Sequence, residues 1–148
     1  MNYPGKELEM FDKAHFWRKY LHLVTKKFIG KKILEVGAGI GSFTKIYIKE
    51  NIDITLSEID NVNYEILKKK FDLQKNVKVE NKFIDQFNET FDTILYLSVL
   101  EHIENDQKEI LNALEKMVED LYEVGNHDAQ YYEEIIGETM YIVLEYDE

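Results

Sequence analysis

The chain has 148 residues, of which 45% are hydrophobic, 13% are aromatic and none is cysteine. This composition predicts one globular domain and excludes a disordered chain, a disulfide scaffold, a thiolate metal site and a cysteine nucleophile. No apolar run approaches the roughly 18 residues that a membrane span needs. Residues 1–10 are polar and contain no secretion signal, so we expect a cytoplasmic protein.

The net charge of −11 comes from 18 basic and 29 acidic residues, and it is unevenly distributed. Residues 115–148 contain 11 acids and one base, whereas the first 114 residues contain 18 acids and 17 bases. A field of this sign repels phosphate backbones. Nucleic acid is therefore disfavoured as a partner, and the acidity belongs to the C-terminal quarter of the chain.

Apolar spacing predicts an N-terminal helix and then strands that alternate with helices. The expected helices cover residues 7–28, 42–50, 61–71 and 106–121, and the expected strands cover 31–36, 52–57, 77–80, 91–97 and 139–146. This alternation predicts an α/β fold with a parallel sheet of about five strands and helices on both faces.

Apolar residues at helical spacing mark one face of each expected helix. In the first and third helices these residues are Leu8, Phe11, Phe16, Tyr20, Leu21, Val24, Phe28, Val62, Ile66, Leu67 and Phe71. In the second and fourth helices they are Phe43, Ile46, Tyr47, Ile110, Leu111, Leu114, Met117, Val118 and Leu121.

A glycine-rich turn follows the first expected strand, where residues 35–42 read EVGAGIGS. Glycines let a ligand approach the main chain, and the helix N-terminus that follows favours an anion. A dinucleotide fingerprint needs a glycine at its sixth position, which here is Ser42. The spacing is G-x-G-x-G instead, with Glu35 two residues before the first glycine.

Two further segments, both later in the sequence than the glycine turn, contain residues that could bind a ligand. Glu58 ends the second expected strand, 21 residues after Gly37, where a carboxylate can accept hydrogen bonds from both hydroxyls of a ribose. Residues 91–103 read FDTILYLSVLEHI and combine the fourth expected strand with the turn after it.

Together, the three segments resemble the motifs of class I S-adenosylmethionine-dependent methyltransferases, over about residues 30–120. The resemblance implies an incomplete Rossmann-like fold, S-adenosylmethionine as the cofactor and methyl transfer to a small-molecule acceptor. It divides the chain into an N-terminal helical lid (1–30), a cofactor-binding core (31–122) and an acidic tail with a last strand (123–148).

The resemblance also assigns residues of the glycine turn to the cofactor. It implies that Gly37, Ala38, Gly39 and Gly41 cradle the methionine part. Glu35 is expected to order this turn or to meet the amino group through water.

The remaining cofactor contacts come from the turns after the later strands. Glu58 is expected to bind the ribose hydroxyls, Ile59 to lie against adenine, and Asn81 and Phe83 to lie near the adenine amine. Ser98, in the turn after the fourth strand, completes the predicted site. In some relatives this position is a glutamate that binds a metal, so the serine predicts no metal site.

Two residues near these motifs have two interpretations each. His102 is either a general base for an acceptor hydroxyl or a packing residue at a helix start. Asp60 either caps the helix that follows it or contacts the ligand, and we expect the cap.

The acceptor cannot be identified from the sequence, although one class is disfavoured. Nucleobase amine methyltransferases carry an N/D-P-P-Y-type motif where this chain has residues 97–100, LSVL. The family's sixth and seventh strands have no counterpart here. This leaves an enzyme, a non-catalytic binding or regulatory partner, or a subunit of a split methyltransferase. The open edge at residues 141–144 predicts a homodimer or a basic protein partner.

Overall fold

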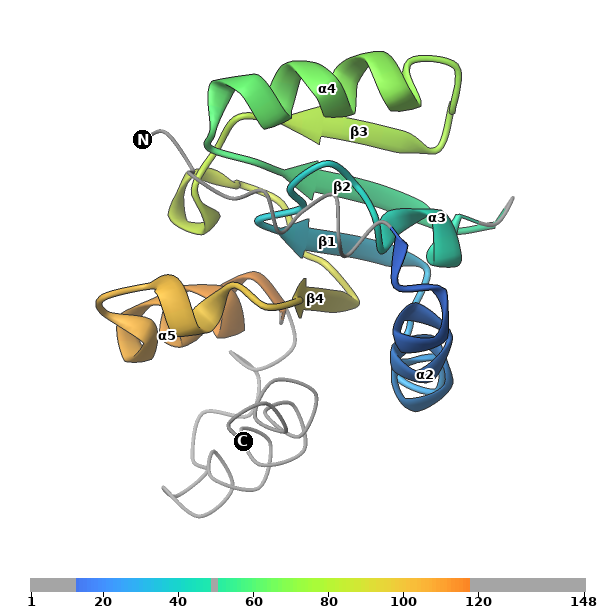
Figure 1. Cartoon of the computed structure of the whole chain (residues 1–148). Helices are drawn as coiled ribbons and strands as arrows, with labels where there is room; N and C mark the ends of the chain where they lie inside the picture. The colour runs from blue at the N-terminus through green and yellow to red at the C-terminus, as the bar shows by residue number, and fades with distance from the viewer. Residues whose placement is uncertain (1–12, 49–50, 118–148) are drawn as a thin grey trace.

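Four parallel strands form the sheet of the computed structural model, which describes residues 13–48 and 51–117 (Figure 1). The strands are β1 (Lys32–Val36), β2 (Asp53–Ser57), β3 (Val77–Glu80) and β4 (Thr93–Tyr96). Their order is β3-β2-β1-β4, and each neighbouring pair is parallel. The predicted parallel α/β fold is confirmed.

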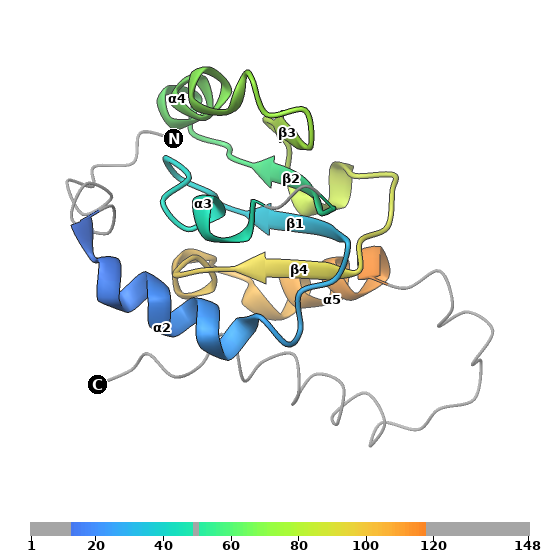
Figure 2. The same ribbon diagram turned by 90° about the vertical axis from the view of Figure 1, so that its right-hand side faces the viewer.

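Helices cover both faces of this sheet, as Figures 1 and 2 show. The α-helices are α2 (His15–Thr25), α3 (Thr44–Tyr47), α4 (Asn61–Phe71) and α5 (Asp106–Met117), and the short 3-10 helices are η1 (Ile84–Gln86) and η2 (Leu100–His102). One apolar cluster joins the first three α-helices to the sheet, and a second joins α5, η1 and η2 to the opposite face. None of the helices in the described ranges is long and apolar enough to cross a bilayer.

Two predicted elements are shorter in the structure. The helix expected at 42–50 is only α3, because residues 39–43 form the turn and Ile48 is already extended. The strand expected at 91–97 is only β4. Before it, the Asp92 carboxylate accepts the main-chain N–H groups of Lys31 and Lys32, both at 2.9 Å. After it, Ser98 has a φ of +58°, which ends the extended backbone.

Several predicted segments fall outside the described residues. They are residues 7–12 of the first expected helix, residues 49–50 of the second, residues 118–121 of the last one and the expected strand at 139–146. The described sheet accordingly has four of the five expected strands, and β4 lies at its edge.

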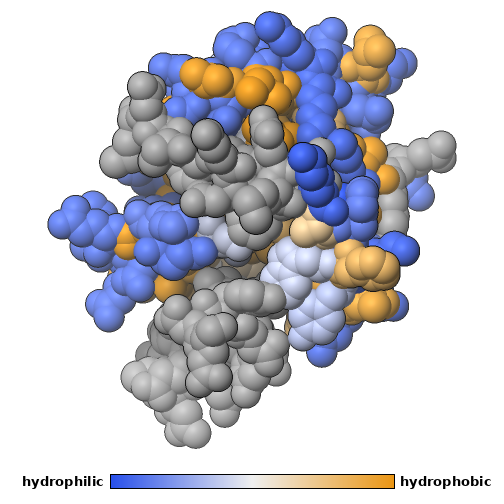
Figure 3. Space-filling model, viewed as in Figure 1, coloured by the Kyte–Doolittle hydropathy of each residue, from blue (hydrophilic) through white to orange (hydrophobic). Residues whose placement is uncertain are grey.

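The apolar residues whose spacing predicted the N-terminal helix are mostly exposed in the structure. Phe16, Tyr20 and Val24 are 89%, 46% and 39% exposed, and Phe28 lies beyond the helix end and is also exposed. Hydrophobic side chains gather over α2 and α4 on the face shown in Figure 3. Of the described residues in the predicted set, Leu21 does pack against the core, and the others are exposed because α2 has two apolar stripes.

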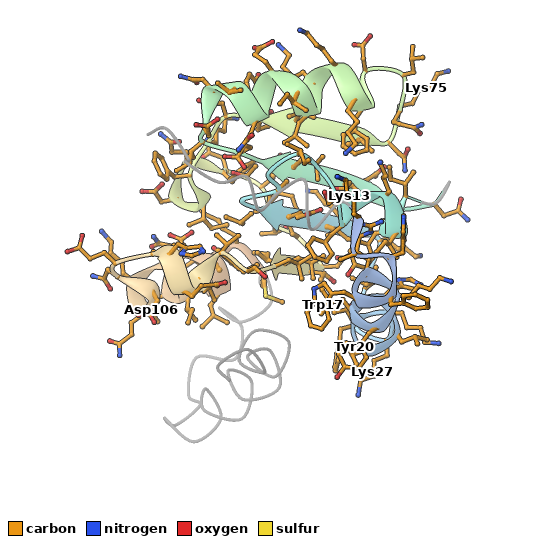
Figure 4. All side chains as sticks on the ribbon, viewed as in Figure 1. Lys13, Trp17, Tyr20, Lys27, Lys75 and Asp106 are labelled. Atoms are coloured by element: carbon orange, nitrogen blue, oxygen red, sulfur yellow. The ribbon has the colours of Figure 1, made fainter. Side chains whose placement is uncertain are left out.

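The other stripe of α2 makes the tertiary contacts. Trp17 and Leu21 pack against the apolar cluster, and the buried Thr25 hydroxyl lies 2.9 Å from the Tyr47 hydroxyl on α3. The Trp17 and Tyr20 rings stack with their centroids 5.7 Å apart, at the border between the two stripes (Figure 4).

The later helices bury narrower stripes than predicted. Leu67 and Phe71 are buried as expected, but Val62 and Ile66 of α4 are 64% and 41% exposed. Leu111 of α5 is also exposed. Each of these helices covers one side of the sheet, so only the residues on the innermost line of the helix lose contact with solvent.

Candidate functional site

The predicted site residues gather at the carboxyl edge of the sheet, to which all four arrowheads point in Figure 1. The strand order reverses here, because the chain continues from β1 to β2 on one side and reaches β4 on the other. Ligands of open α/β sheets bind outside the carboxyl ends of the strands at such a switch point. The turns after β1 and β4 flank this point.

The glycine turn after β1 has a backbone that favours glycine at three positions. Gly37, Gly39 and Gly41 have φ values of +66°, +56° and +69°, a region that other residues adopt only with strain. The Gly41 N–H donates to the Ala38 carbonyl at 2.8 Å, and the Ala38 N–H donates to the Ser57 carbonyl at 3.0 Å. The turn is therefore closed on itself and tied to the end of β2.

Close packing also requires two of these glycines. A Cβ atom at Gly37 would lie 2.7 Å from the Cγ2 of Val99, in the turn after β4. A Cβ atom at Gly41 would lie 2.5 Å from the Phe71 ring and 2.9 Å from Leu67 Cδ2. The approach of a ligand was the reason that the sequence suggested for these glycines. In the structure, Gly37 also packs against the turn after β4, and Gly41 packs against α4.

Glu58 connects the glycine turn to the end of β2. Its Oε2 accepts the Gly39 N–H at 2.7 Å and its Oε1 accepts the Asp60 N–H at 2.8 Å. The residue is only 6% exposed, and this burial raises its pKa while the two N–H groups lower it. A carboxylate has about four lone-pair sites, so both oxygens keep capacity for a further donor.

Glu35 lies behind the same turn and is 3% exposed. Its Oε2 accepts the Thr44 hydroxyl at 2.7 Å, which links β1 to the start of α3. Burial raises the pKa of Glu35 to about 7, and the Thr44 hydroxyl and the Lys70 ammonium act in the opposite direction. These contacts fit the first of its two predicted roles, which was to order the turn.

Asp60 caps α4, as the sequence analysis predicted. Its Oδ1 accepts the N–H groups of Val62 at 3.0 Å and Asn63 at 2.9 Å. Such a cap satisfies main-chain donors that have no partner within the helix, so Asp60 serves the helix rather than a ligand.

The turns after β2 and β3 are joined beside Glu58. The Asn81 side-chain amide donates to the Glu58 carbonyl at 2.7 Å, and the Ser57 hydroxyl donates to the Lys82 carbonyl. Ile59 and Phe83, which follow in these turns, are 39% and 56% exposed. Two apolar side chains therefore lie in solvent at the edge where adenine is predicted.

The predicted residues after β4 are more open. Ser98 and His102 are both exposed, and neither side chain hydrogen-bonds to another described residue. The exposed ring of His102 does not fit the packing role that was its alternative interpretation. Within residues 13–48 and 51–117, no group of three histidine, aspartate or glutamate side chains is placed to bind a metal.

Sequence reasoning missed three residues that shape the turn, namely Thr44, Lys70 and Val99. Lys70 is the last of three consecutive lysines. Only its position beside the buried Leu67 and Phe71 distinguishes it from the other two lysines. Thr44 and Val99 carried no signal, because their partners are distant in the sequence.

The comparison with solved structures gives the same fold at low sequence identity. The glycopeptide N-methyltransferase MtfA, complexed with sinefungin, is 16% identical with a TM-score of 0.58, and the match covers 68% of this chain and 45% of that one. The amino pentose methyltransferase CalS10 from Micromonospora echinaspora, complexed with S-adenosylmethionine, is 12% identical with a TM-score of 0.63, over 80% and 53%. The N-methyltransferase NodS from Bradyrhizobium japonicum, complexed with S-adenosylhomocysteine, is 19% identical with a TM-score of 0.60, over 70% and 56%.

The chain thus spans about half the length of these solved structures. The comparison with curated proteins finds no match. A family model described as a methyltransferase domain matches residues 9–121, which is well over half of the sequence. The chain therefore belongs to the methyltransferase domain family.

Proposed function

We propose that the chain binds S-adenosylmethionine at the carboxyl edge of its sheet and serves the transfer of its methyl group to a small-molecule acceptor. The observation that carries this proposal is the buried Glu58 carboxylate, held at 2.7 Å by the Gly39 N–H of the glycine turn. Family membership and the solved relatives that hold this cofactor or its analogues support it.

The geometry of the edge fits the parts of this cofactor. Three of the five residues of the turn 37–41 are glycines with positive φ values, so its main chain can approach the methionine part closely. The free lone pairs of Glu58 suit the two ribose hydroxyls. Ile59 and Phe83 supply the exposed apolar surface against which the adenine ring can pack.

Methyl transfer demands positioning more than acid–base chemistry from the protein. The bound cofactor supplies an activated sulfonium methyl group, so catalysis depends on holding the acceptor in line with it. The chain contributes the rigid turn and the Glu58 carboxylate to that alignment. His102, exposed after β4, is the described residue that we propose as the base for an acceptor that must lose a proton.

Calorimetric titration with S-adenosylhomocysteine tests the proposed binding. S-adenosylhomocysteine, the product that the cofactor becomes on methyl transfer, should bind the wild-type chain, and Glu58→Ala should weaken the affinity at least tenfold. The reason is that each hydrogen bond to a charged group is worth about 1.5–3 kcal/mol. Glu65→Ala, which removes an exposed acid from α4, is the matched control. Equal affinity for Glu58→Ala and wild type would contradict the ribose assignment.

A partner for the C-terminal edge and a cellular location are proposed separately. The predicted edge at residues 141–144 lies outside the described residues. We propose that a second copy or a basic protein covers it, because residues 115–148 carry 11 acids and one base. Sedimentation at rising salt separates these partners, since screening should tighten a homodimer of acidic tails and release a basic partner. A chain that stays monomeric at every salt concentration and captures no partner would contradict both proposed partners.

The absence of cysteine supports the proposed cytoplasmic location.

A further inference from the structure

Helix α4 contacts the glycine turn through three residues on one face. Leu67 and Phe71 lie where a Cβ at Gly41 would be, and Lys70 reaches the same part of the turn with its ammonium group. Residues three and four apart on a helix are neighbours on its surface. The same helix face therefore supplies both apolar packing and a positive charge to the turn.

The Lys70 ammonium binds the main chain of the turn from behind. Its Nζ donates to the Ile40 carbonyl and lies 3.3 Å from the Gly41 carbonyl. The peptide group that joins these residues also donates its N–H, from Gly41, to the Ala38 carbonyl at 2.8 Å. A cation on the carbonyl of a peptide group strengthens its N–H as a donor, because linked hydrogen bonds polarise one another.

We propose that Lys70 is a positioning residue that fixes the second half of the cofactor turn, residues 39–43, in its binding shape. The part of this inference that concerns the cofactor rests on the proposed function. Helix α3 is only one turn long, so it contributes few main-chain hydrogen bonds to hold the turn. Lys70 replaces that missing support with a charge-assisted contact from a different helix.

Lys70 also acts on the buried Glu35 carboxylate. Its positive charge lowers the pKa of Glu35, which burial raises to about 7. The other polar and titratable groups around this carboxylate are Thr44 and Tyr47 of α3, with His22 of α2 against the Tyr47 ring. Loss of the Lys70 charge should therefore move the Glu35 titration to higher pH.

Amide hydrogen exchange of the cofactor-free chain tests the positioning role directly. In Lys70→Met, which keeps the aliphatic stem beside Phe71, the amides of residues 39–43 should exchange about tenfold faster than in wild type. Lys69→Met removes an exposed charge from the next position of α4 and should leave exchange unchanged. Lys70→Arg retains a cation and should restore most of the protection. Unchanged exchange in Lys70→Met would overturn the proposal.

A substitute variant and a pH titration distinguish a positioning role of Lys70 from a general loss of folded structure. If Lys70→Met fails to fold by circular dichroism, Lys70→Gln takes its place. Its neutral amide keeps at most one of the two carbonyl contacts, so the amides of residues 39–43 should still exchange faster than in wild type, by a smaller factor than expected for Lys70→Met. The pH midpoint of the Glu35 titration should rise in the charge-free variant and stay in place in Lys69→Met. A midpoint that does not move would overturn the electrostatic effect of Lys70 on Glu35.

The effect of Lys70 on cofactor binding is tested separately, by measuring affinity. S-adenosylhomocysteine should bind Lys70→Met about tenfold more weakly than wild type, and Lys70→Arg should recover part of the affinity. Equal affinities would overturn the link between this lysine and the cofactor. Absence of binding to the wild-type chain would instead contradict the proposed function, while the exchange result would still decide the positioning role.

Discussion

The turn after β1 and the turn after β4 flank the same switch point, yet they are built differently. Around the first, Glu35 and Glu58 are 3% and 6% exposed, and each carboxylate is held by a donor at 2.7 Å. In the second, Ser98 and His102 are exposed and their side chains have no hydrogen-bond partner among the described residues. The two turns touch through Gly37 and Val99.

This contrast shows which half of the site the described chain fixes by itself. Buried carboxylates bound to main-chain and hydroxyl donors hold the first turn in one shape, as binding a cofactor with little reorganisation requires. The second turn presents the polar side chains of Ser98 and His102 to solvent. Substitutions in the first turn should therefore affect binding and stability, and those in the second should affect turnover.

The largest effect is expected from Gly39→Val, which alters the first turn alone. Gly39 has a φ of +56° and donates its N–H to Glu58, and a branched residue at this φ is strained by about 1–3 kcal/mol. The domain should remain folded while calorimetry detects no binding of S-adenosylhomocysteine. A folded variant with normal affinity would show that this turn is not the cofactor cradle.

Gly37→Ala tests the contact between the two turns. The new Cβ combines a φ of +66° with a distance of 2.7 Å to Val99, so the free energy of unfolding should fall by about 2–4 kcal/mol. Adding Val99→Ala removes the clash and should recover about half of the loss. Chemical denaturation measures both values, and the absence of any recovery would mean that the turns do not press on each other.

Glu35→Gln should change how stability depends on pH. The folded pKa of Glu35 is raised from 4.5 to about 7, so between these values the folded state keeps a proton that the unfolded state loses. The wild-type free energy of unfolding should therefore fall as pH rises through this window, by about 3 kcal/mol, with the full cost present above pH 7.

The glutamine variant keeps an acceptor for Thr44 and lacks the titration. Its gain over wild type should therefore be larger at pH 8 than at pH 5 in urea denaturation at the two pH values. Glu65→Gln, at an exposed position of α4, is the control. Parallel pH profiles for Glu35→Gln and wild type would contradict the burial of this carboxylate.

Asp60→Ala tests the cap that places α4 against the turn. Loss of the hydrogen bonds to Val62 and Asn63 should lower the free energy of unfolding by about 1 kcal/mol. Asp60→Asn keeps a capping oxygen and should lose much less. Equal losses in both variants would show that the charge, rather than the cap, stabilises the helix.

The smallest effect on structure is expected from His102→Ala in the second turn. Because the ring is exposed, the free energy of unfolding should change by less than about 0.5 kcal/mol. Cofactor affinity should also stay the same, whereas turnover of an acceptor that must lose a proton should fall. Lower affinity for S-adenosylhomocysteine would assign His102 to cofactor binding and contradict the proposed difference between the two turns.

The sequence predicted the parts of the fold that local patterns determine. The strands at 77–80 and 52–57 and the helix at 61–71 depend on short apolar runs and a helix cap, and the structure has them at those positions or within one residue. The glycine turn was recognisable because positive φ angles demand glycine at fixed spacing.

The remainder depends on contacts between distant residues, which no local pattern encodes. Spacing selected Phe16, Tyr20 and Leu21 together, but of these only Leu21 packs against the core, and the unselected Trp17 packs beside it. The partner surface decides which of the two apolar stripes of α2 is buried. In the site, the contact of Lys70 with the turn crosses about 30 residues and could not be read from the run of three lysines.

Residue-resolved amide NMR during titration with S-adenosylhomocysteine tests the central claim most directly. The account predicts that the amide signals of Gly37, Gly39 and Gly41, and those next to Glu58, shift or broaden with saturation. Signals of the exposed stripe of α2, such as that of Phe16, should stay in place. Saturable changes confined to α2, or no change at the glycine turn at cofactor excess, would contradict the claim that this turn binds the cofactor.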